Sequence, residues 1–423
     1  MTTYYEGREA VEPQEREDRL MRLLPYTLEQ AVAKAPAIAE QLEGIDASSI
    51  VTRAHLATIP VLRKSNLLSL QLARHDERVA GTDAERMRVF GGFSTIGWGQ
   101  ARRVFASPGP IYEPEGSRPD YWGFARALYA AGCRRGDLIH NAFSYHFTPA
   151  GSMMETAGHA MGCTVFPAGT GQTEQQVQAM VDLRPTVYAG TPSFLRIILE
   201  RAAEMERALS LRCALVSGEA FPPSLQAWLA ERGVDAYQAY GSADLGMVAY
   251  ETPAREGLVL NEDLILEIVR PGTNDPVPDG EVGEVVVTTL NPDYPLVRFG
   301  TGDLSAVLPG LSPCGRSNVR IRGWMGRADQ TTKVRGMFVQ PGQVAQIVAR
   351  HPAIQAARLE ISGETGNDRM LLKVVLDAPS DSLLADIAAS VREVTKLRAE
   401  VSAVTSDALP NDGKVIDDQR SYE

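Results

Sequence analysis

Short apolar runs alternate with helical segments through the middle of this 423-residue chain, between residues 119 and 241. The strand-like runs are DLIHNAF, CTVFPAG, TVYAGT, LRCALVSG and DAYQAYG, and segments such as TEQQVQAMVDL and SFLRIILERAAEME between them have helical spacing. Strands that are each followed by a helix, at intervals of roughly 25 to 35 residues, predict a parallel sheet with right-handed crossovers. Ligands of such sheets bind at the carboxyl ends of the strands, where the phrases SGEAF and YGSADLG fall.

The regions on either side of this alternation predict other elements. Residues 15–43 have helical spacing, and we expect Pro25 and Pro36 to break them into shorter helices. Beyond Gly246 the pattern changes to hairpins with strands such as LILEIV and EVVVTTL. The end of the chain predicts a helix over 343–350, the strands ARLEIS and RMLLKVVLD, and a second helix from Asp381.

These patterns together predict an α/β fold with two domains. The first, over residues 1–328, is a large α/β domain with several subdomains, one of them a β-subdomain. The second, over residues 329–423, is a small α+β domain with an αββα-like order.

Composition narrows the class of protein. Apolar residues make up 44% of the chain and charged residues 22%, as in ordinary globular proteins. No stretch approaches 18 consecutive apolar residues, so we expect no membrane span, and the polar start MTTYYEGREAVEPQERED is not a secretory signal. A net charge of −11 argues against nucleic acid as a partner. The four cysteines lack CxxC spacing, which favours reduced thiols and a cytoplasmic location.

Two common kinds of catalytic centre are unsupported. The six histidines show no HxxxH spacing, and Cys314 stands alone in SPCGRS, so we expect no metal centre built on histidines and no metal cluster at Cys314. No GxSxG phrase is present, which argues against a Ser-His-Asp hydrolase.

A basic island interrupts this acidic chain between Arg298 and Arg335. It contains seven cations, Arg298, Arg316, Arg320, Arg322, Arg327, Lys333 and Arg335, and two anions, Asp303 and Asp329. One interpretation is a site for a phosphate-bearing ligand. The other is a solvated, charged region of strands and turns.

The phrases RFGTGDL and GRADQTTKVRG in this island resemble the paired signatures of the adenylate-forming (AMP-binding) superfamily, and the phenylacetate–CoA ligases in particular. The resemblance runs across nearly the whole chain. It implies ATP or AMP, coenzyme A and Mg²⁺ as cofactors, a small aryl or acyl acid as substrate, and a mobile C-terminal cap. It also implies that Asp303 holds the ribose hydroxyls, that Arg327 contacts the nucleoside and that Asp329 is the hinge of the cap.

Two further phrases carry the resemblance. Lys414 in LPNDGKVIDD matches the lysine that reaches between the carboxylate and the α-phosphate; the alternative is an exposed lysine in a loose tail. YGSADLG resembles the Tyr-Gly-x-(Ser/Thr)-Glu element, which implies cofactor contacts from Tyr240 and Gly241 and a catalytic, Mg²⁺-holding role for Asp244. Here Ala243 replaces the hydroxyl and Asp244 is one methylene shorter, and a tight turn after a buried strand remains an alternative.

The largest departure from the family lies at the phosphate loop. Relatives have Ser-Ser-Gly-Thr-Thr-Gly-Lys-Pro, whereas this chain has SPGPIYEP from Ser107 to Pro114, with Glu113 in place of lysine. Both threonine hydroxyls are missing and two prolines lack amide donors, and a charged Glu113 would repel a triphosphate. Three interpretations stay open: a diverged ligase, an acyltransferase that moves an acyl group between coenzyme A and an acyl carrier protein, and a binding-only relative. A homodimer is also left open.

The resemblance also assigns residues to the acid and to the thiol step. The residues expected to line the acyl pocket or its cofactor edge are Tyr145, His146, Phe147, Ser217, Gly218, Glu219 and Tyr240, and the aromatic ones favour a flat aryl acid. His146 is equally well interpreted as a packed, hydrogen-bonded histidine. Lys333, Arg335 and Gly336 fall in the loop that closes on the coenzyme A tunnel in the family, or else in a solvated basic turn.

Overall fold

The computed structural model describes residues 3–76, 84–270, 274–328, 330, 332–363, 368–405, 408–409 and 415–420. The chain forms two compact units, Met1–Gly326 and Arg327–Glu423. None of the helices in these described ranges has both the length and the apolar character needed to cross a bilayer.

The larger unit contains a nine-stranded sheet with the strand order β14-β15-β10-β9-β8-β7-β6-β4-β5. Its strands are β4 (Leu138–Asn141), β5 (Thr164–Pro167), β6 (Val187–Gly190), β7 (Cys213–Val216), β8 (Asp235–Ser242), β9 (Gly246–Glu251), β10 (Leu258–Leu260), β14 (Val307–Leu308) and β15 (Arg320–Ile321). The strands from β4 to β8 run parallel, as the alternation predicts, whereas β8 pairs antiparallel with β9 from Ala239 onward. The sheet therefore changes direction at β8, whose end carries the phrase YGSADLG.

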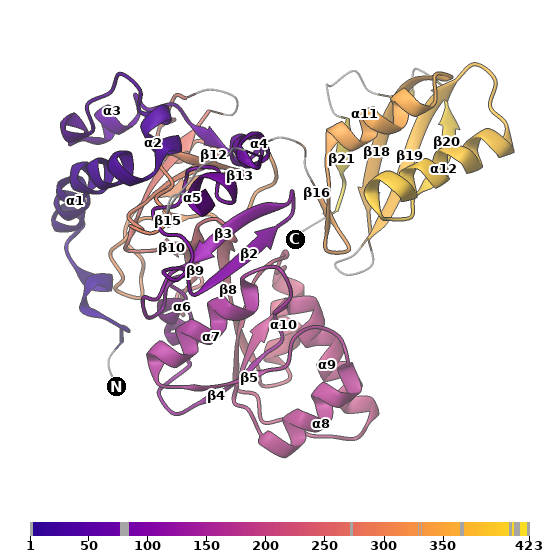
Figure 1. Cartoon of the computed structure of the whole chain (residues 1–423). Coiled ribbons are helices and arrows are strands. Elements are labelled where there is room, and N and C mark those ends of the chain that lie inside the picture. The colour runs from indigo at the N-terminus through magenta and orange to yellow at the C-terminus, as the bar shows by residue number, and fades with distance from the viewer. Residues whose placement is uncertain are drawn as a thin grey trace. The chain divides into compact units, whose positions relative to one another are not determined.

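Helices cover both faces of the parallel strands, because successive residues of a strand point to opposite faces. In β7, Cys213 and Leu215 belong to one core with α6 and α7, while Ala214 and Val216 belong to a second core with α8, α9 and α10 (Figure 1). These helices are α6 (Ala125–Ala130), α7 (Ala150–Met161), α8 (Thr173–Leu183), α9 (Pro192–Glu204) and α10 (Pro223–Ala230). Helices α8 and α9 confirm the helical segments TEQQVQAMVDL and SFLRIILERAAEME expected from the sequence.

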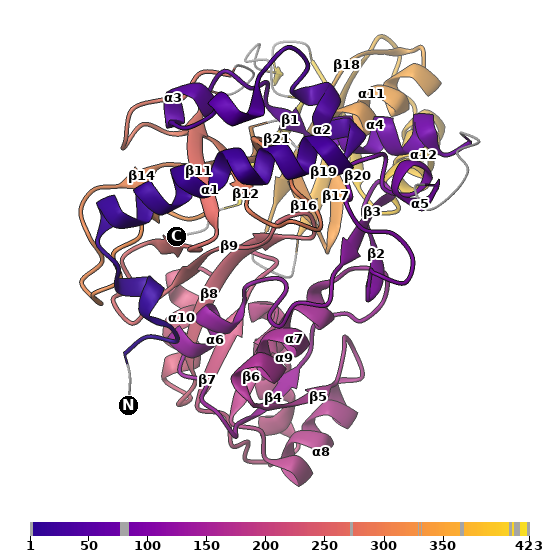
Figure 2. The same ribbon diagram turned by 60° about the vertical axis from the view of Figure 1, so that its left-hand side comes forward.

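A second sheet of the larger unit has the order β1-β13-β12-β11. Its strands are β1 (Leu62–Arg63), β11 (Leu264–Val269), β12 (Gly283–Thr289) and β13 (Phe299–Ser305). Helix α1 (Pro13–Lys34) lies across this sheet (Figure 2), with α2 (Pro36–Gln41), α3 (Arg53–Leu56) and the 3-10 turns Gly7–Ala10 and Ala47–Ser49 beside it in sequence. Leu20, Leu24 and Leu28 of α1 share one buried core with strand residues such as Ile265 and Val287.

The expectation that Pro25 breaks the N-terminal helix is wrong. Helix α1 continues through Pro25, with Leu24 and Leu28 on either side of it fully buried. The packing of this apolar face outweighs the backbone hydrogen bond that proline removes. Pro36 does mark a boundary, as expected, since it is the first residue of α2.

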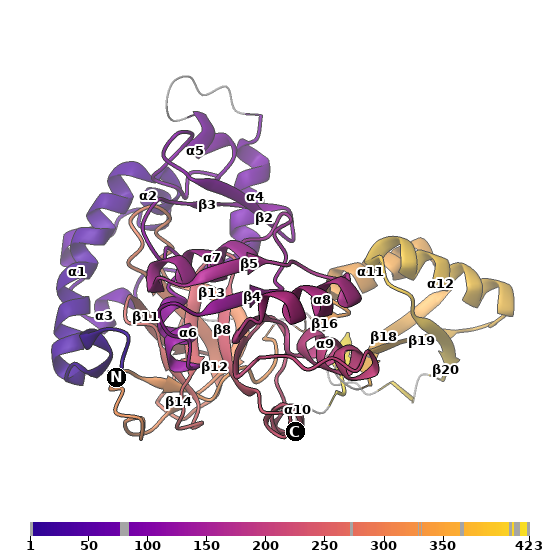
Figure 3. The ribbon, with the colours of Figure 1, turned by 90° about the horizontal axis from the view of Figure 1, so that it is seen from below.

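The predicted phosphate loop is a β-hairpin made of β2 (Arg103–Ser107) and β3 (Ile111–Glu115). It lies beside α4 (Lys64–Arg74), which is followed by α5 (Ala84–Arg88) (Figure 3). Gln71 of α4 joins the two elements: its Oε1 accepts from the Tyr112 amide at 2.8 Å, and its Nε2 donates to the Tyr112 carbonyl at 3.0 Å.

The smaller unit is α+β. Its four-stranded sheet has the order β20-β19-β18-β21, and α11 and α12 pack on it around one core (Figure 1). Its elements are β16 (Thr332–Val334), β17 (Met337–Val339), α11 (Pro341–Arg350), β18 (Ile354–Ser362), β19 (Arg369–Leu376), α12 (Asp381–Thr395), β20 (Glu400–Val404) and β21 (Ile416–Asp418). The expected αββα order is present as α11-β18-β19-α12, preceded by the β16–β17 hairpin and followed by two more strands.

Candidate active site

Asp303 and Tyr240, which the sequence assigns to the nucleotide, meet at the ends of two strands. Asp303 lies on β13 and Tyr240 on β8, and the Tyr240 hydroxyl donates to Asp303 Oδ2 at 2.8 Å. Trp324 Nε1 donates to the other oxygen, Oδ1, at 3.0 Å. The carboxylate is therefore held in one orientation by two donors from separate segments, and it remains partly exposed.

The backbone around Asp303 is fixed by its neighbours in the TGDL phrase. Thr301 Oγ1 accepts from the Asp303 amide at 3.1 Å and donates to the Val285 carbonyl at 3.1 Å. Gly302 has a φ of +73°, which favours glycine, and its amide donates to Glu284 Oε1 at 3.1 Å. The sequence thus builds a rigid, polar strand end rather than a plain core strand.

Gly241 lies where two backbones approach closely. A Cβ at this position would lie 2.5 Å from the carbonyl oxygen of Gly246 on β9, and the pairing of β8 with β9 shifts register between Tyr240 and Gly241. Gly241 is thus required by the fold of this strand end. Its contact with a cofactor stays a prediction.

Asp244, the predicted metal ligand, is paired with a lysine that the sequence analysis did not single out. Its side chain is buried, and Oδ2 accepts from Lys64 Nζ at 2.9 Å. Its other oxygen, Oδ1, has no hydrogen-bond partner in the described part of the chain. Lys64 is the first residue of α4, within the phrase IPVLRKSNL. This phrase resembles the N-terminal helical region of phenylacetate–CoA ligases, which is the signal in the sequence that could have pointed to Lys64.

A buried carboxylate oxygen without a partner is a fitting ligand for a divalent cation. Mg²⁺ is commonly held by one or two carboxylates together with substrate phosphates and water. Among the described residues, no group of three or more His, Cys, Asp or Glu side chains is arranged to hold a metal ion. The residues present therefore fit an ion that arrives with a phosphate ligand better than a resident ion.

The β2–β3 hairpin, at the place of the phosphate loop, directs its polar groups into the protein. The Ala106 amide donates to the Phe147 carbonyl at 2.8 Å, and the strand pairing runs from Arg103↔Glu115 to Ser107↔Ile111. Only alternate amides of an antiparallel pair bond within the ladder, and those of Ala106 and Tyr112 are bonded instead to the Phe147 carbonyl and to Gln71. These amides are therefore not available to phosphate oxygens.

Glu113 of this hairpin is fully buried, and Ser107 Oγ donates to it. Burial raises the pKa of Glu113 well above its usual range and nearby Asp244 adds to the rise, while Lys64 and the Ser107 hydrogen bond oppose it. The expectation that Glu113 presents its carboxylate to a triphosphate is wrong, because the side chain is fully buried. Sequence position alone does not show which way a side chain faces.

The predicted acyl-pocket residues follow β4. Asn141 Nδ2 donates to the half-buried Tyr145 hydroxyl at 2.8 Å, whereas His146 is exposed and Phe147 is 81% exposed. Phe147 also has a φ of +60°, an unusual value for an aromatic residue. The exposed position of His146 argues against the packed-histidine alternative. The contact of these three residues with an acid stays a prediction.

Ser217, Gly218 and Glu219 follow β7, at the carboxyl edge expected for a ligand. Ser217 Oγ donates to the Ala239 carbonyl on β8 at 2.7 Å, which ties β7 to β8. Glu219 Oε1 accepts from the Ser193 amide at 2.7 Å, in the first turn of α9. Gly218 has a φ of +85°. Glu219 thus has a structural partner, and its cofactor contact remains untested.

The residues assigned to the thiol step lie in the smaller unit. Arg335 and Gly336 form the two-residue turn between β16 and β17, with φ values of +46° and +83°, as a type I′ turn requires. The Arg335 guanidinium donates to the Asp368 carbonyl at 2.8 Å, and Lys333 Nζ lies 5.9 Å from the centre of the Phe338 ring. The turn itself explains Gly336, and contacts with coenzyme A stay predictions.

The structure does not place three of the assigned residues beside Asp303 and Tyr240. Arg327 is the first residue of the smaller unit, so its proximity to Asp303 stays a prediction. Asp329 and Lys414 lie outside the described residues.

The basic island is not one phosphate-binding surface. Arg298, Arg316 and Arg320 are buried and paired with Glu267, Glu9 and Glu256 respectively. These three cations support the fold, so the charge count overstated what a ligand would meet. A separate cavity of about 190 Å³ beside α1, lined by Arg8, Arg16, Arg19 and Arg22 among others, contains none of the assigned site residues.

Comparisons with known proteins show which family the chain belongs to. Residues 123–291 match the family model for AMP-binding enzymes. The phenylacetate–coenzyme A ligase of Thermus thermophilus is 30% identical over 380 residues, covering 86% of this chain and 81% of that protein. The ligase of the same name from Aromatoleum evansii is 32% identical over 273 residues, and the match covers 61% of each chain.

Among solved structures, a 2-hydroxyisobutyryl-CoA ligase in complex with 2-HIB-AMP and CoA matches with a TM-score of 0.82. The match has 23% identity and covers 100% of this chain and 93% of that one. At this identity the likeness concerns the fold, and it confirms the α/β class expected from the alternation of strands and helices. Because the Thermus relative is 30% identical and the match covers 86% of this chain, the chain belongs to the phenylacetate–CoA ligase family of AMP-binding, adenylate-forming enzymes.

Proposed function

We propose that this protein activates a small carboxylic acid as its acyl-adenylate and transfers the acyl group to coenzyme A. Family membership supports this function, since the curated relatives are named phenylacetate–coenzyme A ligases. The observation that carries it is the Asp303 carboxylate held between Tyr240 and Trp324. Asp244, on the segment that follows Tyr240, pairs with Lys64 of α4.

In the first half-reaction, a carboxylate oxygen of the acid attacks the α-phosphorus of ATP and the bond to the bridging oxygen breaks, releasing pyrophosphate. In the second, the thiolate of coenzyme A attacks the acyl carbon and AMP leaves with the C–O bonding electrons. Asp303 would bind the ribose cis-diol, and Tyr240 would orient Asp303. Mg²⁺ held at Asp244 would supply positive charge to the phosphates.

The hairpin favours a second candidate function. Because amides of β2 and β3 are bonded within the protein, in the ladder or to Phe147 and Gln71, we expect a weaker grip on the leaving pyrophosphate than a phosphate loop provides. An acyltransferase that moves an acyl group between coenzyme A and a carrier protein would not need that grip. The aryl character of the acid, a carrier-protein partner, a homodimer and a cytoplasmic location are further proposals.

Pyrophosphate exchange separates the two functions. Incubation with ATP, labelled pyrophosphate, Mg²⁺ and a panel of aryl and short aliphatic acids should give label in ATP with at least one acid. No exchange with any acid, together with acyl transfer from a supplied acyl-CoA to a phosphopantetheine thiol, would establish the second function instead.

Replacing Asp303 with asparagine should weaken AMP binding by a factor of about 10 to 100, since a hydrogen bond to a charged group contributes about 1.5–3 kcal/mol. Isothermal titration calorimetry with AMP measures this change. Asp279→Asn, in an exposed turn, is the matched control and should bind AMP as the wild type does. Equal AMP affinity of the wild type and Asp303→Asn would remove Asp303 from the nucleotide site.

A further inference from the structure

Lys64 is carried to the candidate site by the pairing of β1 with β13. Leu62 pairs with Phe299 and Arg63 pairs with Gly300, so α4 begins beside the strand that carries Asp303. From there Lys64 Nζ donates to Asp244 Oδ2 at 2.9 Å and to Ser107 Oγ at 3.3 Å. The Lys64 side chain is 39% exposed, whereas that of Asp244 is 2% exposed. The ammonium therefore lies between a buried carboxylate and solvent.

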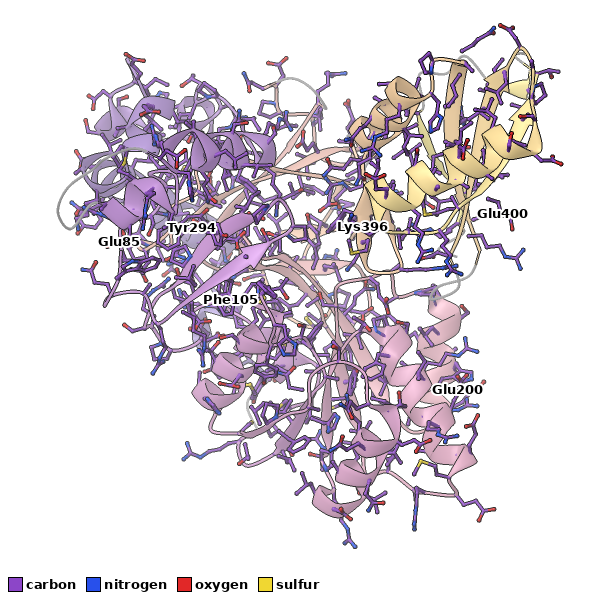
Figure 4. The ribbon with its side chains drawn as sticks, turned by 45° about the vertical axis from the view of Figure 1, so that its right-hand side comes forward. Glu85, Phe105, Glu200, Tyr294, Lys396 and Glu400 are labelled. Atoms are coloured by element: carbon purple, nitrogen blue, oxygen red, sulfur yellow. The ribbon has the colours of Figure 1, made fainter. Side chains whose placement is uncertain are left out.

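Three buried polar side chains, one of them the Lys64 partner Asp244, each have an oxygen atom without a hydrogen-bond partner among the described residues. Glu113 Oε2, Asp244 Oδ1 and the Tyr294 hydroxyl have no hydrogen-bond partner within the described ranges. Tyr294 is labelled in Figure 4, as is Phe105 of β2, the strand that also carries Ser107. Burial raises the pKa of Tyr294 well above its usual range, and Glu113 and Asp244 add to the rise, so the three groups interact with one another.

The hydrogen bonds order these groups into a chain. Glu113 accepts from Ser107, Ser107 accepts from Lys64, and Lys64 also donates to Asp244. When Glu113 holds a proton, Asp244 is the ionised carboxylate of this chain of hydrogen bonds that faces the ammonium of Lys64. When Glu113 is ionised, two carboxylates compete for one cation, and moving Lys64 toward another anion costs more.

We propose that Lys64 contacts the β- and γ-phosphates of ATP in this protein, and that Glu113, acting through Ser107, positions it. Lys64 thereby takes the place of the lysine that Glu113 replaces in the hairpin. Movement of the ammonium toward the phosphates would leave both Asp244 oxygens able to hold a cation that binds together with ATP. The proposal rests on the proposed function, because it assumes that ATP binds beside Asp303.

Titration calorimetry with ATP·Mg²⁺ and with AMP tests the role of Lys64 without requiring turnover. Lys64→Gln should lower the affinity for ATP by a factor of 10 or more and change the affinity for AMP by less than twofold, because AMP lacks the two outer phosphates. Lys64→Arg keeps the charge and should recover part of the ATP affinity. Lys34→Gln, at the exposed end of α1, is the matched control and should match the wild type for both nucleotides.

The outcomes separate the two proposals. A wild type that binds neither ATP nor AMP contradicts the proposed function. If the wild type binds both, equal affinities of wild type and Lys64→Gln for ATP, or an equal loss for ATP and AMP, overturn the role of Lys64. A circular-dichroism melt of each variant shows whether a loss of binding reflects unfolding. Should Lys64→Gln fail to fold, Lys64→Arg is compared with the wild type instead: its affinity for ATP should be lower and its affinity for AMP unchanged.

The role of Glu113 is tested by the pH dependence of ATP binding. The groups that face Glu113 are Ser107 on β2, Lys64 on α4, Asp244 after β8 and Tyr294 before β13. As pH rises through the raised pKa of Glu113, the wild type should lose ATP affinity, whereas Glu113→Gln, which cannot ionise, should keep its affinity across that range. Parallel pH profiles for wild type and Glu113→Gln would overturn the positioning role, because a residue that only fills space leaves the pH profile unchanged.

Discussion

Adenylate formation should fall by a factor of ~10²–10³ when Lys414 is replaced with alanine, which is the size of effect found when one donor to a developing charge is removed. The ammonium would draw the carboxylate and the α-phosphate together and would stabilise the negative charge on the oxygens of the transferred phosphoryl group. Lys414 lies outside the described residues, so this role rests on the phrase LPNDGKVIDD. Pyrophosphate exchange at saturating acid and ATP measures the effect.

The same variant should still convert a supplied acyl-adenylate and coenzyme A to the thioester, at a rate within a few-fold of the wild type. The control is this thioester formation, measured by the disappearance of the supplied acyl-adenylate. It shows that the site is intact. An equal loss in both half-reactions would contradict a role confined to adenylation. Pyrophosphate exchange at the wild-type rate in Lys414→Ala would support the alternative that this lysine lies in an exposed tail.

Replacing Arg298 with methionine should lower the free energy of unfolding of the larger unit by about 3–5 kcal/mol, because breaking a buried ion pair leaves a charge without its partner. Arg298 is fully buried, and Nε donates to Glu267 Oε2 at 2.9 Å. Its other nitrogens donate to the carbonyls of Ala57 and Ile59, at 2.8 Å and 2.5 Å, and of Asn274 at 2.9 Å. One side chain therefore joins β11, the segment before β1 and the loop after β11.

Urea unfolding followed by tryptophan fluorescence measures this loss. The chain has four tryptophans, Trp98, Trp122, Trp228 and Trp324, and all lie in the larger unit, so the signal reports on that unit. Arg322→Met is the matched control from the same basic island, since Arg322 is exposed; its unfolding free energy should change by less than about 0.5 kcal/mol. Similar losses in the two variants would show that the Arg298 ion pair contributes little.

The Arg298–Glu267 pair also predicts non-additivity. Glu267→Leu alone leaves the Arg298 charge buried, whereas the double variant Arg298→Met/Glu267→Leu removes both charges. The loss in the double variant should be smaller than the sum of the two single losses.

Periodicity was sufficient to predict the central part of the fold. The strands β4 to β8 and the helices between them each have an apolar pattern of the right period, and each follows its neighbour closely in sequence, so local signals and tertiary structure agree. Pro25 shows where such reasoning fails. Its local preference predicts a break, but the apolar face around Leu24 and Leu28 packs on a sheet formed by residues more than 200 positions later, which no local window contains.

The predictions for the site also divide into those that a local phrase supports and those that depend on the folded chain. Asp303 and Tyr240 were assigned because each lies in a phrase typical of the family, and the structure joins them by a hydrogen bond. Lys64 and the inward orientation of Glu113 were missed. The contacts of Lys64 with Asp244 and Ser107 join distant segments, and the charge on Glu113 depends on burial, which is a property of the folded chain.

The pairing of β1 with β13 has a consequence for how this protein is made. Leu62 leaves the ribosome long before Phe299, its partner, has been translated. Until then α1 has no sheet to cover its leucine face, and the nascent chain carries exposed apolar surface through most of synthesis. The core of the larger unit therefore cannot close over the leucine face of α1, and α4 cannot take its place beside β13, until residue 300 has been translated.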